Sequence, residues 1–350
     1  MKLAWLAAVT AIGCSGEGGG GESKPTDTQD TAGGGGETPW KAAGEGKAYF
    51  ADGDEDNSLF TLELSRVLAP AEGNAYYGFL SGDGTPAVSL GEIIVSGEDV
   101  TFNYDLGVNG VIVGYNHFEA WHNDTGSQGY GDQVWEGDVN PTVFAALQNL
   151  LVESTSTLNG EGTMRALETA LEDLSAYSLA VSEDSSLSVT QAAVEAETVC
   201  NAVEAPADDH DGDGTITEFD SYIAVLGAGS YVELIQADLD AAYEVVTDKD
   251  SDSAVAIRNA YDGIDSVVES ADYAWGRAYS ATAAASASSA LYYMGEASVA
   301  LGEALTGYDT DEDTVIDPID ESGLDGALDW ISQAAEMEVD VPSAAEDTGG

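Results

Sequence analysis

The sequence predicts an α+β protein in which a small antiparallel β-sandwich is followed by an α-helical bundle that carries two acidic loops. Two observations predict this order. Between residues 47 and 125, apolar residues recur at every second position, as they do in half-buried strands. From residue 142 to residue 340 they recur at every third and fourth position, as they do on amphipathic helices. The turn-rich stretch 126–141 marks the junction.

The β region contains a series of short alternating stretches. Phe60, Leu62 and Leu64 alternate with polar neighbours. Similar alternation recurs at Tyr77/Phe79, Val88/Leu90, Ile93/Val95, Val100/Phe102/Tyr104 and Val111/Val113/Tyr115. Short strands separated by Gly and Asp turns are typical of an antiparallel sandwich.

One part of this region carries a resemblance. Residues 76–104, which read YYGFLSGDGTPAVSLGEIIVSGEDVTFNY, are similar to the extracytoplasmic β-sandwich of anti-sigma-K-type factors. The resemblance implies a sandwich without a catalytic motif. We expect no signalling role of that kind, because we find neither the cytosolic domain nor the membrane span that it needs.

The helical region predicts a bundle of six to eight helices. Its apolar stripes include Met164/Leu167/Leu171/Leu174, Val232/Ile235/Leu239 and Leu291/Met294/Leu301. Capping-box patterns predict helix starts at Ser188/Gln191, Ser230/Glu233 and Ser322/Asp325.

An acidic stretch at residues 209–220, DHDGDGTITEFD, has carboxylates at positions one, three, five and twelve. With this spacing a short loop can wrap oxygen ligands around a hard cation. Gly214, at position six, supplies the necessary bend because glycine tolerates a positive φ. The predicted ligands are Asp209, Asp211, Asp213, the carbonyl of Thr215, and Asp220.

This stretch resembles an EF-hand calcium loop. Because Asp220 stands where most EF-hands have Glu, it also resembles dockerin-type loops. The resemblance implies Ca²⁺ as the bound ion, with Mg²⁺ as the alternative. The other interpretation is an acidic turn that only faces solvent.

A second loop, residues 309–320, reads DTDEDTVIDPID, with Thr314 in place of the glycine. Its predicted ligands are Asp309, Asp311, Asp313, the carbonyl of Val315, and Asp320, with Glu321 as an alternative closing carboxylate. The two loops lie far apart in the chain, and Pro206 precedes the first. We therefore expect metal to stabilise folding rather than to open a groove between paired hands. The acidic stretches at 52–63 and 248–255 match the pattern less well and favour ordinary turns.

The N-terminus predicts export. The segment MKLAWLAAVTAIGC has a basic residue, a short apolar run and a small residue before Cys14. It resembles a bacterial lipobox, which implies that Cys14 is acylated (for example with palmitate) and anchors the protein to the envelope membrane, with the outer membrane or cell surface as destination. Ordinary secretion is the alternative. Residues 15–46 read as a Gly-rich tether, and 341–350 as a disordered tail.

Composition excludes several classes of function. The chain has 65 acidic and 9 basic residues and a net charge of −56, so we expect it to avoid nucleic acid. This negative charge has two explanations: many cation sites, or a surface adapted to high salt. We expect the salt-adapted surface to account for most of the charge. GxSxG, HExxH, GxxxxGK[ST] and CxxC motifs are absent from the sequence, and we expect no enzymatic activity.

The remaining histidines and the second cysteine favour structural interpretations. His117 and His122 are five residues apart on an extended segment, so they should face opposite sides of a sheet, as surface or loop residues rather than metal ligands. Cys200 lies in a predicted helix and is expected to be a buried, inert thiol.

These observations lead to two functional hypotheses. The first is a calcium-binding lipoprotein of the cell envelope that uses metal structurally and has an interaction or scaffolding role. The second is an envelope protein that binds a ligand or solute in its helical bundle. A pocket lined by Tyr273, Trp275, Tyr292 and Tyr293 would favour the second, and a filled bundle the first. In both cases an envelope protein or ligand remains to be identified as the partner.

Overall fold

A computed structural model describes residues 43–51, 58–82, 84–126, 131–219, 223–309, 316 and 321–342. These residues belong to one compact unit, Lys41–Gly350. Within them a mainly β part precedes a helical part, so the predicted α+β class and the order of its two parts are confirmed. The predicted leader, Cys14 and most of the tether lie outside the described residues.

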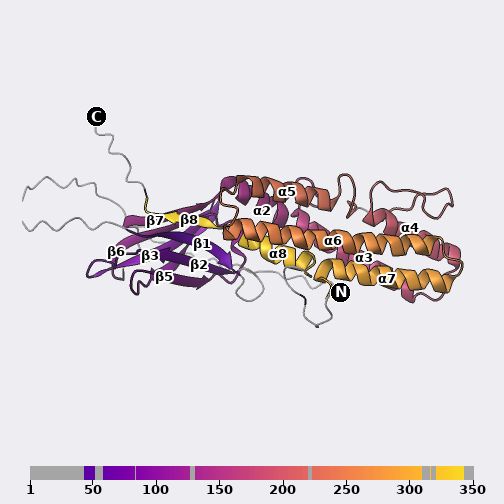
Figure 1. Ribbon diagram of the computed structural model, residues 1–350, viewed down its shortest axis with the longest axis horizontal. Helices are drawn as coiled ribbons and strands as arrows, with labels where there is room; N and C mark the ends of the chain where they lie inside the picture. Colours follow the sequence, from indigo (N-terminus) through magenta and orange to yellow (C-terminus); the bar gives the residue numbers. More distant parts are fainter. Residues whose placement is uncertain are drawn as a thin grey trace, which may run out of the picture. The chain divides into compact units, whose positions relative to one another are not determined.

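The described strands form one antiparallel sheet with the order β4-β3-β6-β7-β8-β1-β2-β5 (Figure 1). They are β1 (Glu45–Ala51), β2 (Leu59–Ser65), β3 (Asn74–Gly82), β4 (Thr85–Ile93), β5 (Val100–Asp105), β6 (His117–Asp124), β7 (Asp132–Val139) and β8 (Met337–Asp340). The expected sandwich of two stacked sheets is therefore replaced by a single continuous sheet.

This sheet curls around its own core. Phe60 on β2 and Phe118 on β6 are separated by three intervening strands, yet their ring centroids lie 5.5 Å apart. In a flat sheet, with about 4.8 Å between strands, they would be about 19 Å apart. Phe50, Phe60 and Phe118 are all fully buried, as are Leu62 and Trp135. The alternation predicted at Phe60, Leu62 and Leu64 places these three side chains in the core.

A short helix replaces the strand expected at Val111, Val113 and Tyr115. Helix α1 (Gly110–Val113) begins after Asn109, whose side chain accepts hydrogen bonds from the backbone N–H groups of Val111 and Ile112. Gly114 ends it with a φ of 98°. An Asn cap and a left-handed Gly stop define one helical turn locally, and this local chemistry overrides the alternating apolar pattern.

Two strands lie where the sequence analysis expected none. Strand β7 occupies half of the predicted junction 126–141, and β8 comes from the C-terminal end of the predicted helical region. In β7, Gly137 and the acidic residues obscure the alternation, and β8 is only four residues long, too short for its alternation to stand out. In β8, Met337 and Val339 are nevertheless fully buried, whereas Glu338 and Asp340 are exposed.

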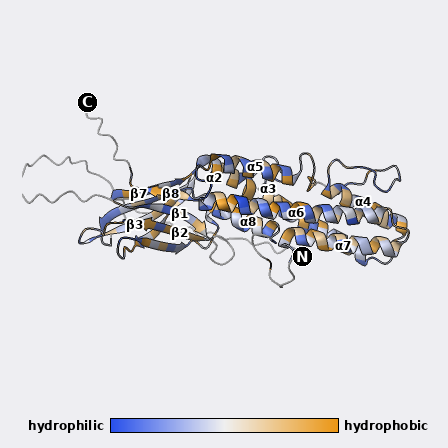
Figure 2. Cartoon of the chain, viewed as in Figure 1, coloured by the Kyte–Doolittle hydropathy of each residue, from blue (hydrophilic) through white to orange (hydrophobic). Residues whose placement is uncertain are grey.

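The helical part contains α2 (Pro141–Leu151), α3 (Thr163–Glu183), α4 (Val189–Val203), α5 (Tyr231–Val245), α6 (Asp252–Thr282), α7 (Ala287–Thr306) and α8 (Leu324–Gln333). Each helix carries hydrophobic and hydrophilic residues on different sides (Figure 2). Their buried faces supply a core in which alanine is frequent. None of the helices in the described residues has both the length and the apolar composition needed to cross a membrane.

Two of the three predicted capping sites are confirmed. Ser188 and Gln191 form a reciprocal capping box at the start of α4, and the Ser230 side chain accepts a hydrogen bond from the Glu233 backbone at the start of α5. The third prediction is wrong, because α8 begins after Gly323 without a side-chain cap, and Ser322 is buried.

Several contacts join the sheet to the helices. Lys47 on β1 forms an ion pair with Asp252 at the start of α6. Asn109, which precedes α1 in the β part, donates from Nδ2 to Ser332 Oγ on α8 over 3.2 Å. Ser253 Oγ of α6 donates to the carbonyl of Ala334, which ends α8 shortly before β8, over 2.7 Å. Because β8 follows α8 directly, the end of the helical part is also covalently continuous with the middle of the sheet.

The close approach of Gly110 to Phe50 gives a stability prediction. A Cβ on Gly110 would lie 2.2 Å from the Phe50 ring, whereas a Cβ on Gly276 in α6 would meet nothing within 4 Å. We expect Gly110→Ala to destabilise the protein by about 1–3 kcal/mol through overpacking. The matched control Gly276→Ala should stabilise it by about 0.5–1 kcal/mol, since Ala favours helix. Urea unfolding measures both changes, and equal midpoints for the two variants would contradict the prediction.

Candidate metal centre

The predicted loop at 209–220 follows α4, and the structure describes it up to Phe219. The carboxylate of Asp209 accepts hydrogen bonds from the backbone N–H of Gly212 over 2.8 Å and of Gly214 over 2.9 Å. Gly214 has a φ of 89°, as expected of a residue that bends the loop at position six. The first predicted ligand therefore also organises the turn.

The next two acidic positions repeat this arrangement. Asp211 accepts a hydrogen bond from the Asp213 N–H over 2.9 Å, and Asp213 accepts one from the Thr215 N–H over 2.7 Å. Each carboxylate thus fixes the backbone two residues ahead of it, which is a turn that Asp favours. Asp220, the predicted closing ligand, lies outside the described residues.

The structure adds Glu197, a residue on α4 that the sequence analysis did not consider. Its side chain is only 1% exposed. One carboxylate oxygen accepts a hydrogen bond from the Thr217 N–H over 2.6 Å, and the other accepts one from the Asp211 N–H over 3.1 Å. Glu197 therefore holds both the acidic half of the loop and the half that follows it.

Three carboxylates converge at this point. Glu197, Asp209 and Asp211 each offer one oxygen, and these oxygens all lie within 4.8 Å of one another. Oxygens that share a Ca²⁺ at about 2.3–2.6 Å have separations up to this size. Partial burial and the nearby negative charges of Asp213, Glu197 and Asp209 raise the pKa of Asp211, while a backbone hydrogen bond opposes the shift. A bound cation would relieve this repulsion.

Asn201, one helical turn after Glu197, holds the two ends of the loop. Its amide nitrogen donates to the carbonyls of Asp208 over 3.0 Å and Thr217 over 2.8 Å. Its side-chain oxygen accepts from the Asp208 N–H over 2.8 Å. Residues four apart lie on the same face of a helix, so one face of α4 supports the loop.

Two aromatic residues of the loop contact other helices. The His210 ring packs edge-on against Trp275 and Tyr279 of α6, with centroids 6.0 Å and 5.9 Å apart. Phe219 packs edge-on against Tyr177 of α3 at 5.2 Å. Together with α4, the loop therefore contacts three helices.

Of the second predicted loop, only Asp309 and Ile316 are described; Asp311, Asp313, Val315 and Asp320 lie outside the described residues. Its two ends are close together, because the Tyr308 N–H donates to the Glu321 carbonyl over 3.0 Å. Glu321, the alternative closing residue, is buried.

The remaining candidates occupy separate places. His117 Nδ1 lies 2.7 Å from Asp138 Oδ1, whereas His122, on the other face of β6, accepts a hydrogen bond from the Ala71 N–H and contacts the Tyr76 ring. The expectation of a surface His122 is wrong, because it is buried, and burial lowers its pKa. Cys200 is buried as expected, and burial raises its pKa to about 12.

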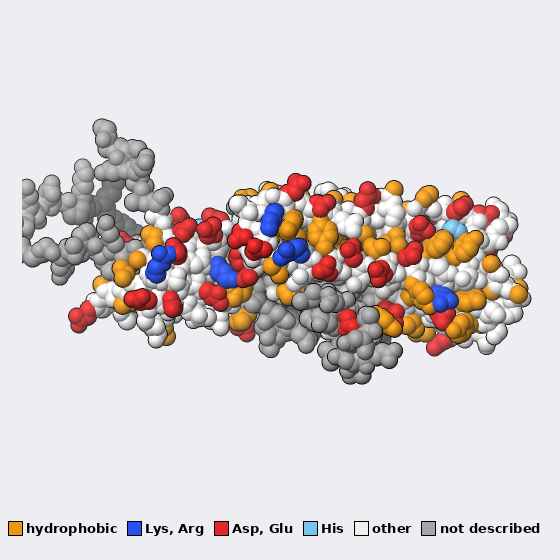
Figure 3. Space-filling view, in the orientation of Figure 1, with side chains coloured by type: hydrophobic (Ala, Val, Ile, Leu, Met, Phe, Trp, Pro, Cys, Tyr) orange, Lys and Arg blue, Asp and Glu red, His pale blue; other side chains and the backbone are white. Residues whose placement is uncertain are grey.

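Acidic side chains are spread over the visible face of the molecule, on the sheet and the helices alike (Figure 3). The metal centre is therefore distinguished by convergence on buried Glu197 and not by acid content. The signal available in the sequence was the pair Glu197 and Asn201, two polar residues four apart in the second half of α4, where every residue from 196 to 203 is buried.

Comparison with known proteins gives no relatives: no family model, no curated protein and no solved structure matches this chain. The function is therefore argued from the site itself.

The role of Glu197 can be tested without metal. In the presence of chelator, we expect Glu197→Gln to lower the free energy of unfolding by about 1–3 kcal/mol, because one of the two loop N–H groups would then face an amide NH₂ instead of an acceptor. The same substitution at exposed Glu204, the residue that ends α4, is the control and should have little effect. Urea denaturation of both variants measures the difference. Equal midpoints would show that Glu197 does not hold the loop.

Proposed function

We propose that this protein is a calcium-binding lipoprotein of a bacterial cell envelope, in which the metal stabilises the helical domain and the folded domains serve an interaction or scaffolding role. The observation that carries the metal part is the convergence of Glu197, Asp209 and Asp211 in a loop that contacts three helices. An ion at this point would draw the loop toward α4 and so connect it with α3 and α6.

The chemistry of the site favours a hard cation. Its donors are carboxylate oxygens, which Ca²⁺ accepts in sets of six to eight with flexible geometry. Asp213, the carbonyl of Thr215 and Asp220 are the further ligands that the sequence predicts. Mg²⁺ is the alternative ion, although it requires a smaller and more regular octahedral shell. The second loop at 309–320 would act in the same way between α7 and α8.

The envelope location is proposed from the sequence alone. Cys14 follows a short apolar leader and precedes a Gly-rich tether, which would allow a lipid on Cys14 to hold the folded domains at a membrane surface. Calcium concentrations are often high outside the cytosol, so weak sites with Kd of about 10⁻⁴–10⁻³ M would stay filled. We also propose that the protein is not an enzyme and that it does not bind nucleic acid.

A second candidate function is ligand binding by the helical part. It is favoured by a groove that includes Tyr273 and Tyr292, two of the four aromatic residues expected in such a site. Trp275 does not line this groove; it stacks on Tyr279 beside His210 of the metal loop.

Calcium should raise the thermal stability of the protein. At about 10 mM calcium, roughly 10- to 100-fold above a Kd of about 10⁻⁴–10⁻³ M, the folded state gains about 1.4–2.7 kcal/mol, which corresponds to a rise in Tm of about 3–10 °C. Asp209→Ala should lose most of this rise, and Asp309→Ala tests the second loop in the same assay. Scanning calorimetry in calcium and in chelator measures the response.

The control is Asp250→Ala, which removes an exposed carboxylate from the acidic stretch at 248–255 and should keep the wild-type response to calcium. A wild-type Tm that is the same in chelator and in millimolar calcium would overturn the structural role of the metal.

Lipidation gives a separate prediction. In a bacterial host fed a labelled fatty acid, the wild-type protein should acquire the label and fractionate with membranes, because Cys14 would be the lipidated residue. Cys14→Ser should remove both properties, whereas Cys200→Ser, which changes a buried thiol, should leave the labelling intact. Label on the Cys14→Ser variant would contradict the proposed anchor.

A further inference from the structure

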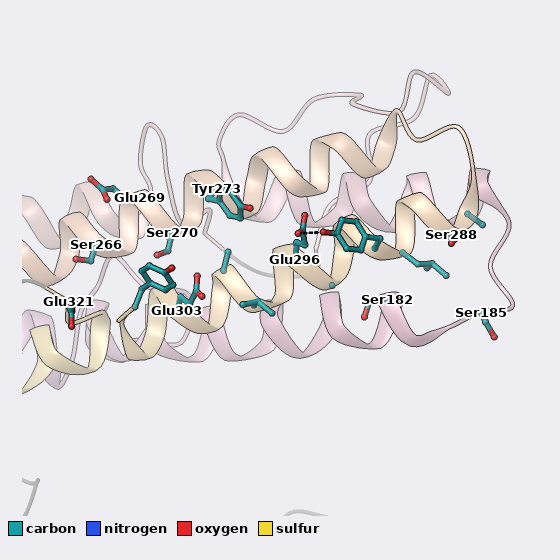
Figure 4. A pocket seen from close by; sticks show the side chains of 17 residues that line it. Ser182, Ser185, Ser266, Glu269, Ser270, Tyr273, Ser288, Glu296, Glu303 and Glu321 are labelled. Atoms are coloured by element: carbon teal, nitrogen blue, oxygen red, sulfur yellow. Dashed lines mark hydrogen bonds between the residues drawn. The ribbon is translucent and has the colours of Figure 1, made fainter. Parts of the chain in front are cut away.

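A long groove runs along α6 and α7, with a volume of about 1170 Å³. Its lining residues on α7 extend from Ala287 to Glu303, which corresponds to about 24 Å of helix. The lining of α6 comes from one helical stripe, Ser266, Glu269, Ser270 and Tyr273. Figure 4 shows Tyr273 on α6 and Glu296 and Glu303 on α7 along this groove.

Small residues explain why there is room for the groove. Ala287, Gly295 and Ala300 on α7 and Ser182 on α3 belong to its lining. A Cβ on Gly295 would come within 3.7 Å of the Ser182 side chain, so α3 and α7 approach closely at this point. Because these side chains are short, they do not fill the space between the tyrosines and glutamates that flank them.

The lining combines aromatic rings with negative charge. Tyr273 is 48% exposed, and Tyr292 is 61% exposed. Val299, which lies between Tyr292 and Glu303 on α7, is also 61% exposed. The carboxylates in the lining are Glu269, Glu296, Glu303 and Glu321, and none of the residues that line it in the described part of the chain is Lys, Arg or His. This surface attracts a cation that also carries apolar groups.

One end of the groove shows how a cation is held there. Arg277, one turn after Tyr273, places its guanidinium 4.5 Å from the centre of the Tyr273 ring, and its Nε lies 3.4 Å from Glu296 Oε2. Tyr292 donates a hydrogen bond to the other oxygen of Glu296 over 2.6 Å. Arg277 therefore already occupies the cation-binding position that the Tyr273 ring and the Glu296 carboxylate form.

In the part of the chain that the structure describes, two other carboxylates of the groove, those of Glu269 and Glu303, have no arginine beside them of the kind that Glu296 has. Among the described residues, no ion pair joins Glu269 or Glu303 to a basic side chain. Burial raises the pKa of Glu303, and a basic side chain placed beside it would stabilise its ionised form. Glu269 and Glu303 are therefore positions in this groove at which a basic side chain of a bound segment would meet a carboxylate that is not already paired with Arg277.

We propose that this groove is the docking site for a basic and partly apolar segment of a partner protein, whose Lys or Arg side chains lie beside Glu269 and Glu303 while its apolar side chains cover Val299 and Tyr292. A segment of about seven extended residues spans 24 Å, which a small amine does not. The inference rests on the interaction role proposed above and names the chemistry of the partner.

The test uses a fluorescein-labelled peptide of about eight residues in which lysine and leucine alternate, sized to the length of the groove. Binding to the full chain is followed by fluorescence anisotropy in calcium at physiological ionic strength, where distant surface charges are largely screened. We expect saturable binding that Glu269→Gln/Glu303→Gln weakens on the order of tenfold, since the loss of each charge pair weakens binding by up to about fivefold. Tyr292→Ala should also weaken it, because it removes apolar surface that a leucine of the peptide covers.

The matched control is Glu92→Gln/Glu244→Gln, which removes the same charge from exposed positions on β4 and α5 and should change the affinity less than twofold. Equal weakening by both double variants would overturn the proposal, because the peptide would then bind only to the overall negative charge. Spermine that binds the groove as tightly as the peptide would also overturn it, in favour of a small amine. Unchanged melting temperatures verify that the variants are folded.

The outcome is separable from that of the metal proposal. The Asp209→Ala variant should no longer be stabilised by calcium. At a temperature well below its Tm, where it is folded, it should still bind the peptide. Peptide binding without a calcium response would overturn only the structural role of the metal. A calcium response without specific peptide binding would overturn only the docking site.

Discussion

The backbone ladders of β8 connect the two halves of the sheet. Met337 and Val339 pair with β1 on one side and with β7 on the other. Without these ladders, β4-β3-β6-β7 and β1-β2-β5 would be separate sheets, each with one more exposed edge. The curled core around Phe60 and Phe118 requires both halves, so it depends on a strand contributed from near the end of the chain. The same strand, through α8 and the Asn109–Ser332 hydrogen bond, ties the sheet to the helices.

The helical part uses polar residues in its interior in a comparable way. Glu197 and Asn201 are both largely buried on α4, and both are satisfied by backbone groups of the loop that follows. A buried carboxylate without a cation close by is costly unless hydrogen bonds satisfy it. Two N–H donors do so here, and they also place Asp209 and Asp211 beside it. The geometry that stabilises the loop is therefore the geometry that would receive an ion.

Small residues have two effects on the helices. Alanine, serine and glycine allow α3, α6 and α7 to pack closely, as at Ser175, where the hydroxyl donates to the Ser298 carbonyl over 3.0 Å. On the outer side of the same helices, small residues leave the groove open between larger Tyr and Glu side chains. A chain with a net charge of −56 repels other acidic surfaces, which is why the segment proposed to dock in this groove is basic.

The sequence by itself determined the features that depend on neighbouring residues. These include the β2 alternation, the caps at Ser188 and Ser230, and the Gly214 bend. Each rests on contacts within a few residues, which spacing reveals. The tertiary structure decided the pairing of β8, the single curled sheet, and the meeting of Glu197 with Asp209 and Asp211. These depend on hydrogen bonds and packing between residues distant in sequence, whose partners a local pattern does not specify. Residues 110–113 are an exception among the local features. The Asn109 cap and the left-handed Gly114 form one helical turn there, although the apolar residues alternate as they would in a strand.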